Sequence, residues 1–347
     1  LQGLGSYPAD DNQFLGMLGM HGTYEANNAM YECDLMINIG ARFDDRITGK
    51  IDEFSPKSKK VHIDIDPSSI NKNVKVDLAV VGDVKKVVAS IIKTLKKKKP
   101  NFVKSNKQKT SKWWEKIQKW RSKRSLDYIG SEETIKPQYA VERLYELTKD
   151  KDTYITTEVG QHQMWAAQHY KFNKPNRWMT SGGLGTMGYG LPAAVGVQVA
   201  HPNKLVIDIA GEASVLMTMQ EMSTAVQYGL PIKIFILNNQ YMGMVRQWQE
   251  LLHDKNYSES YTAALPDFVK LAEAYGCVGL RAKTPEELDD KIIEMLNTDQ
   301  PVIFDCRVDK QENCFPMIPS GKPHNQMLLG PKDQKEKKIT GKGRTLV

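Results

Sequence analysis

The chain has 347 residues, of which 40% are hydrophobic and 26% are charged, and this is enough to build about two packed domains. No run of about 18 apolar residues occurs, so the sequence predicts no membrane span, and no signal peptide is visible. The formal net charge of +7 gathers largely in 96–124 and 332–344, without a recognisable nucleic-acid-binding module. We interpret these two stretches as a solvated linker and tail.

The first segment, up to about residue 95, alternates helical and strand patterns. We expect a helix over 25–33 and strands over 34–39, 60–65 and 80–83. Strand ends marked by Gly and Asp are typical of a Rossmann-like half-domain, here without a GxGxxG loop. The sequence therefore predicts a domain over 1–95, followed by a basic, partly helical linker over 96–135.

The alternation resumes at Lys136. The expected strands are 154–158, 204–209, 232–237 and 301–307, and the expected helices are 139–148, 190–200, 217–228, 266–275 and 285–296. We place a second domain over 136–330 and a basic tail over 331–347. The predicted fold class is α/β, with two Rossmann-like parallel-sheet domains.

One βαβ unit in this second domain carries a possible metal site. The segment GEAS over 211–214 follows a buried strand, and Asn238 and Asn239 follow the next strand. Glu212 and Asn239 would thus lie at the carboxyl ends of two parallel strands, where open α/β sheets bind ligands. A carboxylate and an amide oxygen suit Mg²⁺, and a diphosphate could supply further oxygens. An ordinary βαβ unit with turn residues at its strand ends has the same spacing, so spacing alone leaves both interpretations open.

The same stretch resembles the diphosphate-binding motif of thiamine diphosphate enzymes, in which Gly-Asp-Gly is followed by a spacer and Asn-Asn. Its continuation over 240–248, QYMGMVRQW, resembles the catalytic subunit of the acetohydroxyacid synthase (acetolactate synthase) family. Further segments of this resemblance are 15–22 (LGMLGMHG), 40–46 (GARFDDR), 183–192 (GLGTMGYGLP) and 316–321 (PMIPSG). The resemblance covers nearly the whole chain but no N-terminal pyrimidine-binding domain of the family, so we expect a fragment that opens within a domain.

The resemblance implies the reaction. The ylid of thiamine diphosphate adds to pyruvate, CO₂ leaves, and the carbanion attacks a second pyruvate or 2-oxobutanoate, in a step of valine, leucine and isoleucine synthesis. Glu212, Asn239 and the carbonyl of Tyr241 match the family's Mg²⁺ ligands. The family has Asp where this chain has Glu212. It is open whether a rotamer or backbone shift absorbs the longer arm, or whether metal binding is weaker.

The resemblance also implies a cradle for the diphosphate and the thiazolium. Ala213 and Ser214 would meet the diphosphate at a helix N-terminus. Met187 would lie beneath the thiazolium and enforce a bent cofactor conformation. The other positions that match cofactor-binding loops are Gly160, Gln161, His162, Gly185, Gly243 and Met244.

The first domain resembles the C-terminal part of the family's FAD-binding middle domain, mainly over 21–42 and 64–83. This FAD would be structural, because the net reaction transfers no electrons. The matching positions are Met20, His21, Arg42, Asp64, Ile65, Asp83 and Val84. Asp64 stands at a strand end, where a carboxylate can accept hydrogen bonds from hydroxyls of the flavin nucleotide.

Four positions match the family's substrate and herbicide channel. Arg46 matches a residue at the channel mouth, where a guanidinium could bind a 2-oxo acid, although an Asp45–Arg46 salt bridge of purely structural kind is the alternative. Trp248 matches the residue that sets preference for 2-oxobutanoate, and Trp248 and Ser320 belong to the herbicide site. We count Met187, Arg46 and Trp248 among the catalytic residues.

The family's catalytic Glu lies in the domain without a counterpart here and comes from a neighbouring subunit, so we expect this fragment alone to be inactive. The parent protein would be a homodimer or higher oligomer, with a regulatory small subunit as a further candidate partner. We expect it to bind neither nucleic acid nor a membrane. Four cysteines without CxxC spacing indicate a reducing compartment, and we expect a cytoplasmic protein, with organellar targeting left open. The alternatives are another thiamine diphosphate-dependent decarboxylase or oxidase, and a non-catalytic FAD- or nucleotide-binding module.

Overall fold

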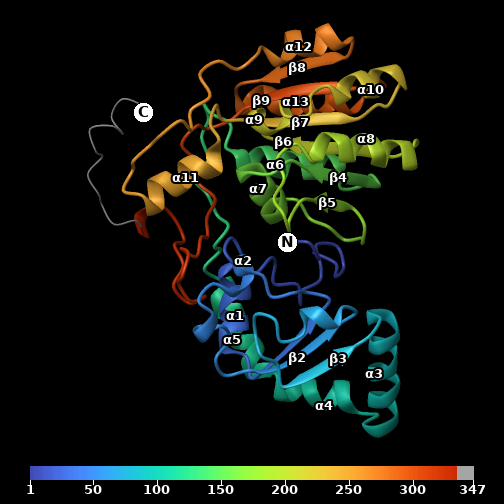
Figure 1. Cartoon of the computed structure of the whole chain (residues 1–347), viewed down its shortest axis with the longest axis vertical. Helices are drawn as coiled ribbons and strands as arrows, with labels where there is room; N and C mark the ends of the chain where they lie inside the picture. Colours follow the sequence, from blue (N-terminus) through green and yellow to red (C-terminus); the bar gives the residue numbers. More distant parts are fainter. Residues whose placement is uncertain (334–347) are drawn as a thin grey trace. The chain divides into compact units, whose positions relative to one another are not determined.

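The computed structural model describes residues 1–333, so most of the expected tail over 331–347 lies outside the described residues. The chain forms two compact units, and most of their helices and strands are labelled in Figure 1. The large unit comprises Leu1–Phe14 and Tyr128–Cys314. The small unit comprises Leu15–Asp127 and Phe315–Asp333.

The large unit is built on a six-stranded sheet in the order β5-β4-β6-β7-β9-β8, and every adjacent pair is parallel. The strands are β4 (Thr153–Thr157), β5 (Trp178–Thr180), β6 (Leu205–Ala210), β7 (Lys233–Asn238), β8 (Val278–Ala282) and β9 (Val302–Arg307). The four central strands are buried along nearly their whole length. Such continuous burial is expected of a parallel sheet that helices cover on both faces.

Helices cover both faces of this sheet. One face carries α6 (Pro137–Thr148), α7 (Gln161–His169) and α13 (Pro285–Leu296), and the other carries α8 (Gly190–Ala200), α10 (Glu221–Gln227) and α12 (Phe268–Tyr275). The core beneath the second set includes Leu191, Ala194, Ile234, Ile236 and Phe268. Two further helices, α9 (Glu212–Val215) and α11 (Gly243–Leu252), follow β6 and β7 directly.

The direction of the winding reverses between β4 and β6. From β4 the chain passes through α7 to β5 on one side, and it returns through α8 to β6 on the other side of β4. Where the winding of an open α/β sheet reverses, the adjacent loops diverge and leave a crevice at the carboxyl ends of the strands. The loops after β4 and β6 are therefore placed to bind a ligand.

The small unit contains a three-stranded parallel sheet in the order β1-β2-β3. Its elements are α1 (Tyr24–Glu32), β1 (Leu35–Ile39), α2 (Asp45–Thr48), η1 (Ile51–Glu53), β2 (Lys59–Asp64), η2 (Pro67–Ser69), β3 (Leu78–Val81), α3 (Val84–Lys98), α4 (Phe102–Lys109), α5 (Ser111–Arg121) and η3 (Pro331–Asp333). A small core is formed by Met30, Phe43, Phe54 and Val74.

The predicted α/β class with two parallel sheets is confirmed, but several element predictions need correction. The third strand occupies Leu78–Val81, not 80–83, and the helix expected over 217–228 begins only at Glu221, because the chain first forms α9 and a turn. Helix α3 extends to Lys98, and its basic last turn suits the negative end of the helix dipole.

The segment expected as a linker over 96–135 is mostly helical and lies in the small unit up to Asp127. Helix α5 packs on α1, because it buries Ile117 and pairs Lys116 with Glu32. The segment 315–333, which we expected within the second domain, groups with the small unit.

Candidate functional site

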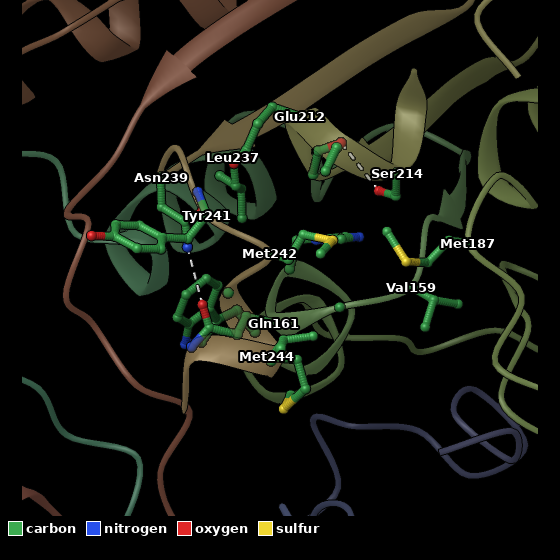
Figure 2. A pocket seen from close by; sticks show the side chains of 17 residues that line it. Val159, Gln161, Met187, Glu212, Ser214, Leu237, Asn239, Tyr241, Met242 and Met244 are labelled. Carbon is green, nitrogen blue, oxygen red and sulfur yellow. Dashed lines mark hydrogen bonds between the residues drawn. The ribbon is translucent and has the colours of Figure 1, made fainter. Parts of the chain in front are cut away.

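A pocket lies at the carboxyl edge of the large sheet, where the loops after β4, β6 and β7 converge (Figure 2). It lies entirely within the large unit. Its lining residues are Val159, Gly160, Gln161, His162, Trp165, Met187, Gly211, Glu212, Ala213, Ser214, Leu237, Asn239, Tyr241, Met242, Gly243, Met244 and Val245. This edge holds the crevice that the reversal of winding predicts.

Glu212 brings a buried carboxyl group to this pocket. It opens α9 directly after β6, and only 1% of the residue is exposed. Within residues 1–333, the structure gives its Oε1 atom no hydrogen-bond partner. Burial raises the pKa of Glu212 to about 8, although backbone N–H groups of Glu212, Tyr241 and Asn239 oppose this rise. A buried carboxyl group is costly without a partner, so this position is suited to a cation.

Asn239 follows β7 and is fixed by hydrogen bonds on both sides of its amide. Its Nδ2 donates to Gln161 Oε1 at 3.0 Å, and its Oδ1 accepts from the backbone N–H of Tyr241 at 3.1 Å. Gln161 is itself oriented, because its Nε2 donates to Gln247 Oε1 at 2.9 Å and to the carbonyl of Glu312 at 3.0 Å. The network therefore defines which atom of Asn239 is the oxygen.

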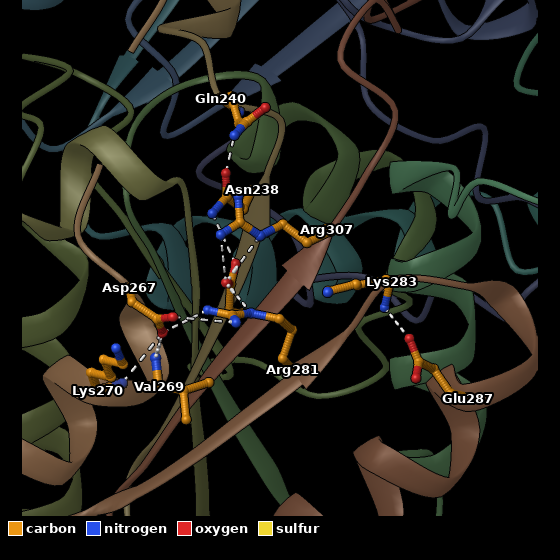
Figure 3. A network of polar contacts seen from close by, with 10 residues as sticks. Asn238, Gln240, Asp267, Val269, Lys270, Arg281, Lys283, Glu287 and Arg307 are labelled. Atoms are coloured by element: carbon orange, nitrogen blue, oxygen red, sulfur yellow. Dashed lines mark hydrogen bonds and ion pairs between the residues drawn. The ribbon is translucent and has the colours of Figure 1, made fainter. Parts of the chain in front are cut away.

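A second polar network supports the turn after β7 (Figure 3). Asn238 Nδ2 donates to Asp305 Oδ1 at 2.8 Å, and Asn238 Oδ1 accepts from the backbone N–H of Gln240 at 3.2 Å. Asp305 is fully buried and is paired with Arg281 at 2.9 Å and Arg307 at 3.0 Å. This network supports Gln240, whose φ of 62° places it in the left-handed region.

Two glycines allow the walls of the pocket to approach closely. A Cβ atom on Gly211 would lie 2.6 Å from His162 Nδ1, and one on Gly243 would lie 2.0 Å from Gln161 Oε1. The buried ring of His162 therefore packs directly on the backbone of the Gly211 loop. Burial lowers the pKa of His162 to about 3, so this ring is neutral at physiological pH.

Most of the predicted thiamine diphosphate positions line this pocket, but two predicted residues of the large unit do not. Gly185 is exposed in the loop before α8, with a φ of 74°, and Trp248 is partly buried on α11. Neither belongs to the lining. Conversely, we did not predict Val159, Trp165, Leu237, Met242 and Val245. Trp165 could have been found, because it lies one helical turn after Gln161 on α7.

The predicted FAD positions lie in the small unit, at or just after the carboxyl ends of β1, β2 and β3, and they are Arg42, Asp64, Ile65, Asp83 and Val84. Asp64 is 8% exposed, and its Oδ1 accepts from the backbone N–H of Asp66 at 2.9 Å. Ile65 is 68% exposed. Asp83 caps α3 by accepting from the backbone N–H of Lys86 at 3.0 Å, so this side chain has a structural role in the chain itself.

The remaining predicted residues form a second group in the small unit. The backbone N–H of Met20 donates to the carbonyl of Arg46 at 2.8 Å, and that of Ile318 donates to the carbonyl of Met20 at 2.8 Å. His21 Nδ1 lies 3.1 Å from the carbonyl of Pro316. The loops that carry Met20, Arg46 and Ser320 are therefore joined. Arg46 pairs with Asp45 at 3.3 Å, and both side chains are exposed.

Among residues 1–333, no group of three or more His, Cys, Asp or Glu side chains could hold a metal ion. A site with one carboxylate, one amide and one carbonyl would not form such a group. No helix in the described part of the chain has the length and apolar character needed to cross a bilayer.

Comparison with known proteins identifies the family. The model "Thiamine pyrophosphate enzyme, C-terminal TPP binding domain" matches residues 158–306, which include every lining residue of the pocket. The model "Thiamine pyrophosphate enzyme, central domain" matches residues 1–91. This chain belongs to the thiamine pyrophosphate enzymes. Thiamine pyrophosphate is another name for thiamine diphosphate, so the resemblance found in the sequence is confirmed.

Three curated relatives of this chain are acetolactate synthase large subunits. The chain is 48% identical to the acetolactate synthase large subunit of Haemophilus influenzae over 337 residues, covering 97% of this chain and 58% of the relative. It is 45% identical to the isozyme 3 large subunit of Escherichia coli, covering 95% of this chain and 57% of that relative. The large subunit of the alga Cyanidium caldarium is 46% identical over 94% of this chain and 55% of its own length. The chain thus spans somewhat more than half the length of these relatives.

Proposed function

We propose that the protein is the catalytic subunit of an acetolactate synthase. It would condense two pyruvate molecules, or pyruvate and 2-oxobutanoate, into 2-acetohydroxy acids with release of CO₂. The observation that carries this proposal is the pocket lined by both the fixed amide of Asn239 and the buried carboxyl of Glu212, whose Oε1 has no hydrogen-bond partner among residues 1–333. The curated relatives offer no support for a pyruvate oxidase or for a non-catalytic module.

The residues of this pocket fit Mg²⁺ and the diphosphate of the cofactor. Glu212 supplies a carboxylate once a cation compensates its burial, Asn239 supplies an amide oxygen, and Tyr241 adds its carbonyl. Because Gly211 has no side chain, only backbone lies beside the position where Ala213 and Ser214 would face the diphosphate. Both groups would therefore bind at the ends of β6 and β7.

Thiamine diphosphate, when bound, supplies the ylid that makes the first pyruvate nucleophilic. The chain's own residues bind and orient it. Met187 lines the same pocket and would support the thiazolium. Gln161 accepts a hydrogen bond from Asn239 Nδ2, and it would thereby keep the Asn239 oxygen pointing away from the Gln161 side chain. The apolar lining by Val159, Leu237 and Met244 would keep water away from the reacting centre.

For the small unit we propose a structural FAD at the carboxyl ends of β1–β3, near Asp64 and Ile65. The support is an edge of parallel strands with the buried carboxylate of Asp64 and the exposed apolar side chain of Ile65, which suits a nucleotide. Arg46, Trp248 and Ser320 are proposed as substrate-channel residues. The relatives are named large subunits, and we propose a regulatory small subunit and assembly with further copies of the chain as partners.

The proposal is tested on the full-length protein by measuring acetolactate formed from pyruvate with thiamine diphosphate, Mg²⁺ and FAD added. Asn239→Ala should raise the concentrations of cofactor and Mg²⁺ needed for half-maximal activity by about tenfold or more, since a buried polar contact is worth about 1–3 kcal/mol. Asn203→Ala, at an exposed turn outside the pocket, is the matched control and should leave them unchanged. Absence of acetolactate, or equal cofactor dependence in both variants, would refute the assignment.

A further inference from the structure

Glu158 is a fully buried carboxyl group directly after β4, and the proposed function gives it no role. Its Oε2 accepts a hydrogen bond from the backbone N–H of Gly188 at 2.5 Å. Its Oε1 accepts from the backbone N–H of Leu191 at 3.0 Å. The side chain thus joins the end of β4 to the loop before α8 and to the first turn of that helix.

Both ends of this connection lie next to a wall of the cofactor pocket. Val159 follows Glu158, and Met187 precedes Gly188, and both line the pocket (Figure 2). The Gly188 peptide is held on its other side too, because Thr218 Oγ1 donates to its carbonyl at 3.2 Å. Gly188 has a φ of 85°, and a Cβ there would lie 3.0 Å from the Thr218 methyl group, so the loop has little room to adjust.

A second buried carboxyl group, Asp208 on β6, lies beside Glu158. Glu158 continues β4 alongside β6, because its backbone N–H donates to the carbonyl of Ile209 at 3.2 Å. A Cβ on Gly190 would lie 2.2 Å from Asp208 Oδ1 and 2.6 Å from the backbone nitrogen of Glu158. Asp208 Oδ1 accepts from Thr156 Oγ1 at 3.0 Å, and Oδ2 has no hydrogen-bond partner among residues 1–333. Asp208 therefore has far fewer donors than Glu158.

This difference decides which carboxyl group carries the charge. Burial raises the pKa of Glu158, but four backbone N–H groups around the start of α8 oppose the rise. Burial raises the pKa of Asp208 well above its usual value, and the neighbouring charge of Glu158 raises it further. Two adjacent buried carboxylates cannot both ionise cheaply, and the larger number of N–H donors around Glu158 favours the negative charge on Glu158 over Asp208.

We propose that Glu158 is a positioning residue whose carboxyl group, bound to the Gly188 and Leu191 amides, fixes Met187 and Val159 at the cofactor pocket. The effect on the cofactor rests on the proposed function. The anchoring of the loop does not, because it is a property of the chain without any ligand.

The test compares two isosteric changes, Glu158→Gln and Asp208→Asn, in the full-length protein. Glutamine presents an amide donor to a backbone N–H, so one hydrogen bond is lost and two donors face each other. Asparagine at 208 copies the shape of a neutral acid, and its oxygen still accepts from Thr156. If both carboxyl groups were merely structural and equivalent, the two variants would behave alike.

Hydrogen-exchange mass spectrometry of peptides covering 183–192 gives a readout independent of cofactor and activity. Exchange in this segment should accelerate by about tenfold or more in E158Q, since a hydrogen bond to a charged group is lost, and by less than about twofold in D208N. E158D keeps the charge on a shorter arm and should fall between wild type and E158Q. If E158Q does not fold, the comparison is made between E158D and D208N, and exchange over 183–192 should be faster in E158D.

Calorimetric titration with thiamine diphosphate and Mg²⁺, together with initial rates, then tests the effect on the pocket. E158Q should weaken cofactor binding by about tenfold and lower kcat with little change in the pyruvate KM, while D208N retains wild-type values. Unchanged exchange over 183–192 in E158Q, or equal effects of E158Q and D208N, would overturn the proposal. A wild-type protein that binds no thiamine diphosphate would refute the proposed function, whereas the exchange result would still decide the anchoring.

Discussion

Gly243 offers a direct test of the geometry around Asn239. It is the first residue of α11, and its φ is not among the positive values, so an alanine would suit the backbone itself. The obstacle is space, because a Cβ atom would lie 2.0 Å from Gln161 Oε1 and 2.7 Å from Asn239 Nδ2. Gly243→Ala therefore places a methyl group between the two amides that hydrogen-bond at 3.0 Å.

The expected magnitude follows from what this methyl group displaces. Separating Gln161 from Asn239 leaves buried amide atoms unsatisfied, at about 1–3 kcal/mol. Both neighbours are tied elsewhere, Gln161 to Gln247 and Asn239 to Tyr241, so they cannot simply rotate away. The helix preference of alanine over glycine offsets at most about 1 kcal/mol of this loss. We expect a net destabilisation of about 1–2 kcal/mol and cofactor binding weakened by about tenfold.

Urea unfolding followed by circular dichroism measures the first quantity, and calorimetric titration with thiamine diphosphate and Mg²⁺ measures the second. Gly196→Ala is the matched control, since Gly196 is exposed within α8 and a Cβ there meets no atom of residues 1–333 within 4 Å. This control should gain about 0.5–1 kcal/mol and leave cofactor binding unchanged. If Gly243→Ala is stabilised like the control and binds the cofactor normally, the described contact of Gln161 and Asn239 is wrong.

Three further predictions concern the metal, the acceptor and pH. Glu212→Asp should preserve or improve Mg²⁺ affinity in titrations, and a strong loss would show that the site is built around the longer arm of Glu. Trp248→Leu in the full-length protein should cut the product ratio of acetohydroxybutyrate to acetolactate, by about 10-fold or more for a methyl-sized contact, and an unaltered ratio would assign Trp248 to packing. Burial lowers the pKa of Lys233 to about 8, so the unfolded chain binds more protons than the folded one between about pH 8 and 10.5, and the free energy of unfolding should rise across this window. Lys233→Met should flatten that rise in urea unfolding at several pH values, and an unchanged slope would contradict the assignment.

The centre of the site was accessible from the sequence because its residues stand at the ends of strongly apolar strands. β6 and β7 are continuous buried runs, so Glu212 and Asn239 could be placed at one edge of the sheet from the pattern alone. Their resemblance to the thiamine diphosphate motif then decided between a turn and a ligand site. The family model confirms a thiamine pyrophosphate binding domain over 158–306, and the metal-binding role of Glu212 and Asn239 within it stays a prediction.

Elements with weak or mixed hydropathy were missed. β8 contains Gly279 and Arg281, and β5 has only three residues, so neither forms a recognisable apolar run. Helix α7 begins with buried Gln161, His162 and Gln163, which line or support the pocket and remove the usual apolar stripe. In these places the local pattern serves the site rather than the core.

Glu158 shows why part of the site cannot be predicted from the sequence alone. As a residue at a strand end it has no motif, and a carboxylate there is compatible with simple exposure to water. Only the winding of the chain, which brings the start of α8 over the end of β4, turns this side chain into a buried acceptor for the Gly188 and Leu191 amides. The same winding places Asp208 beside it, and the charge of Glu158 adds to burial in raising the pKa of Asp208. The residues that would contact the cofactor can therefore be found from short motifs, whereas those that hold them in place follow from the topology of the sheet.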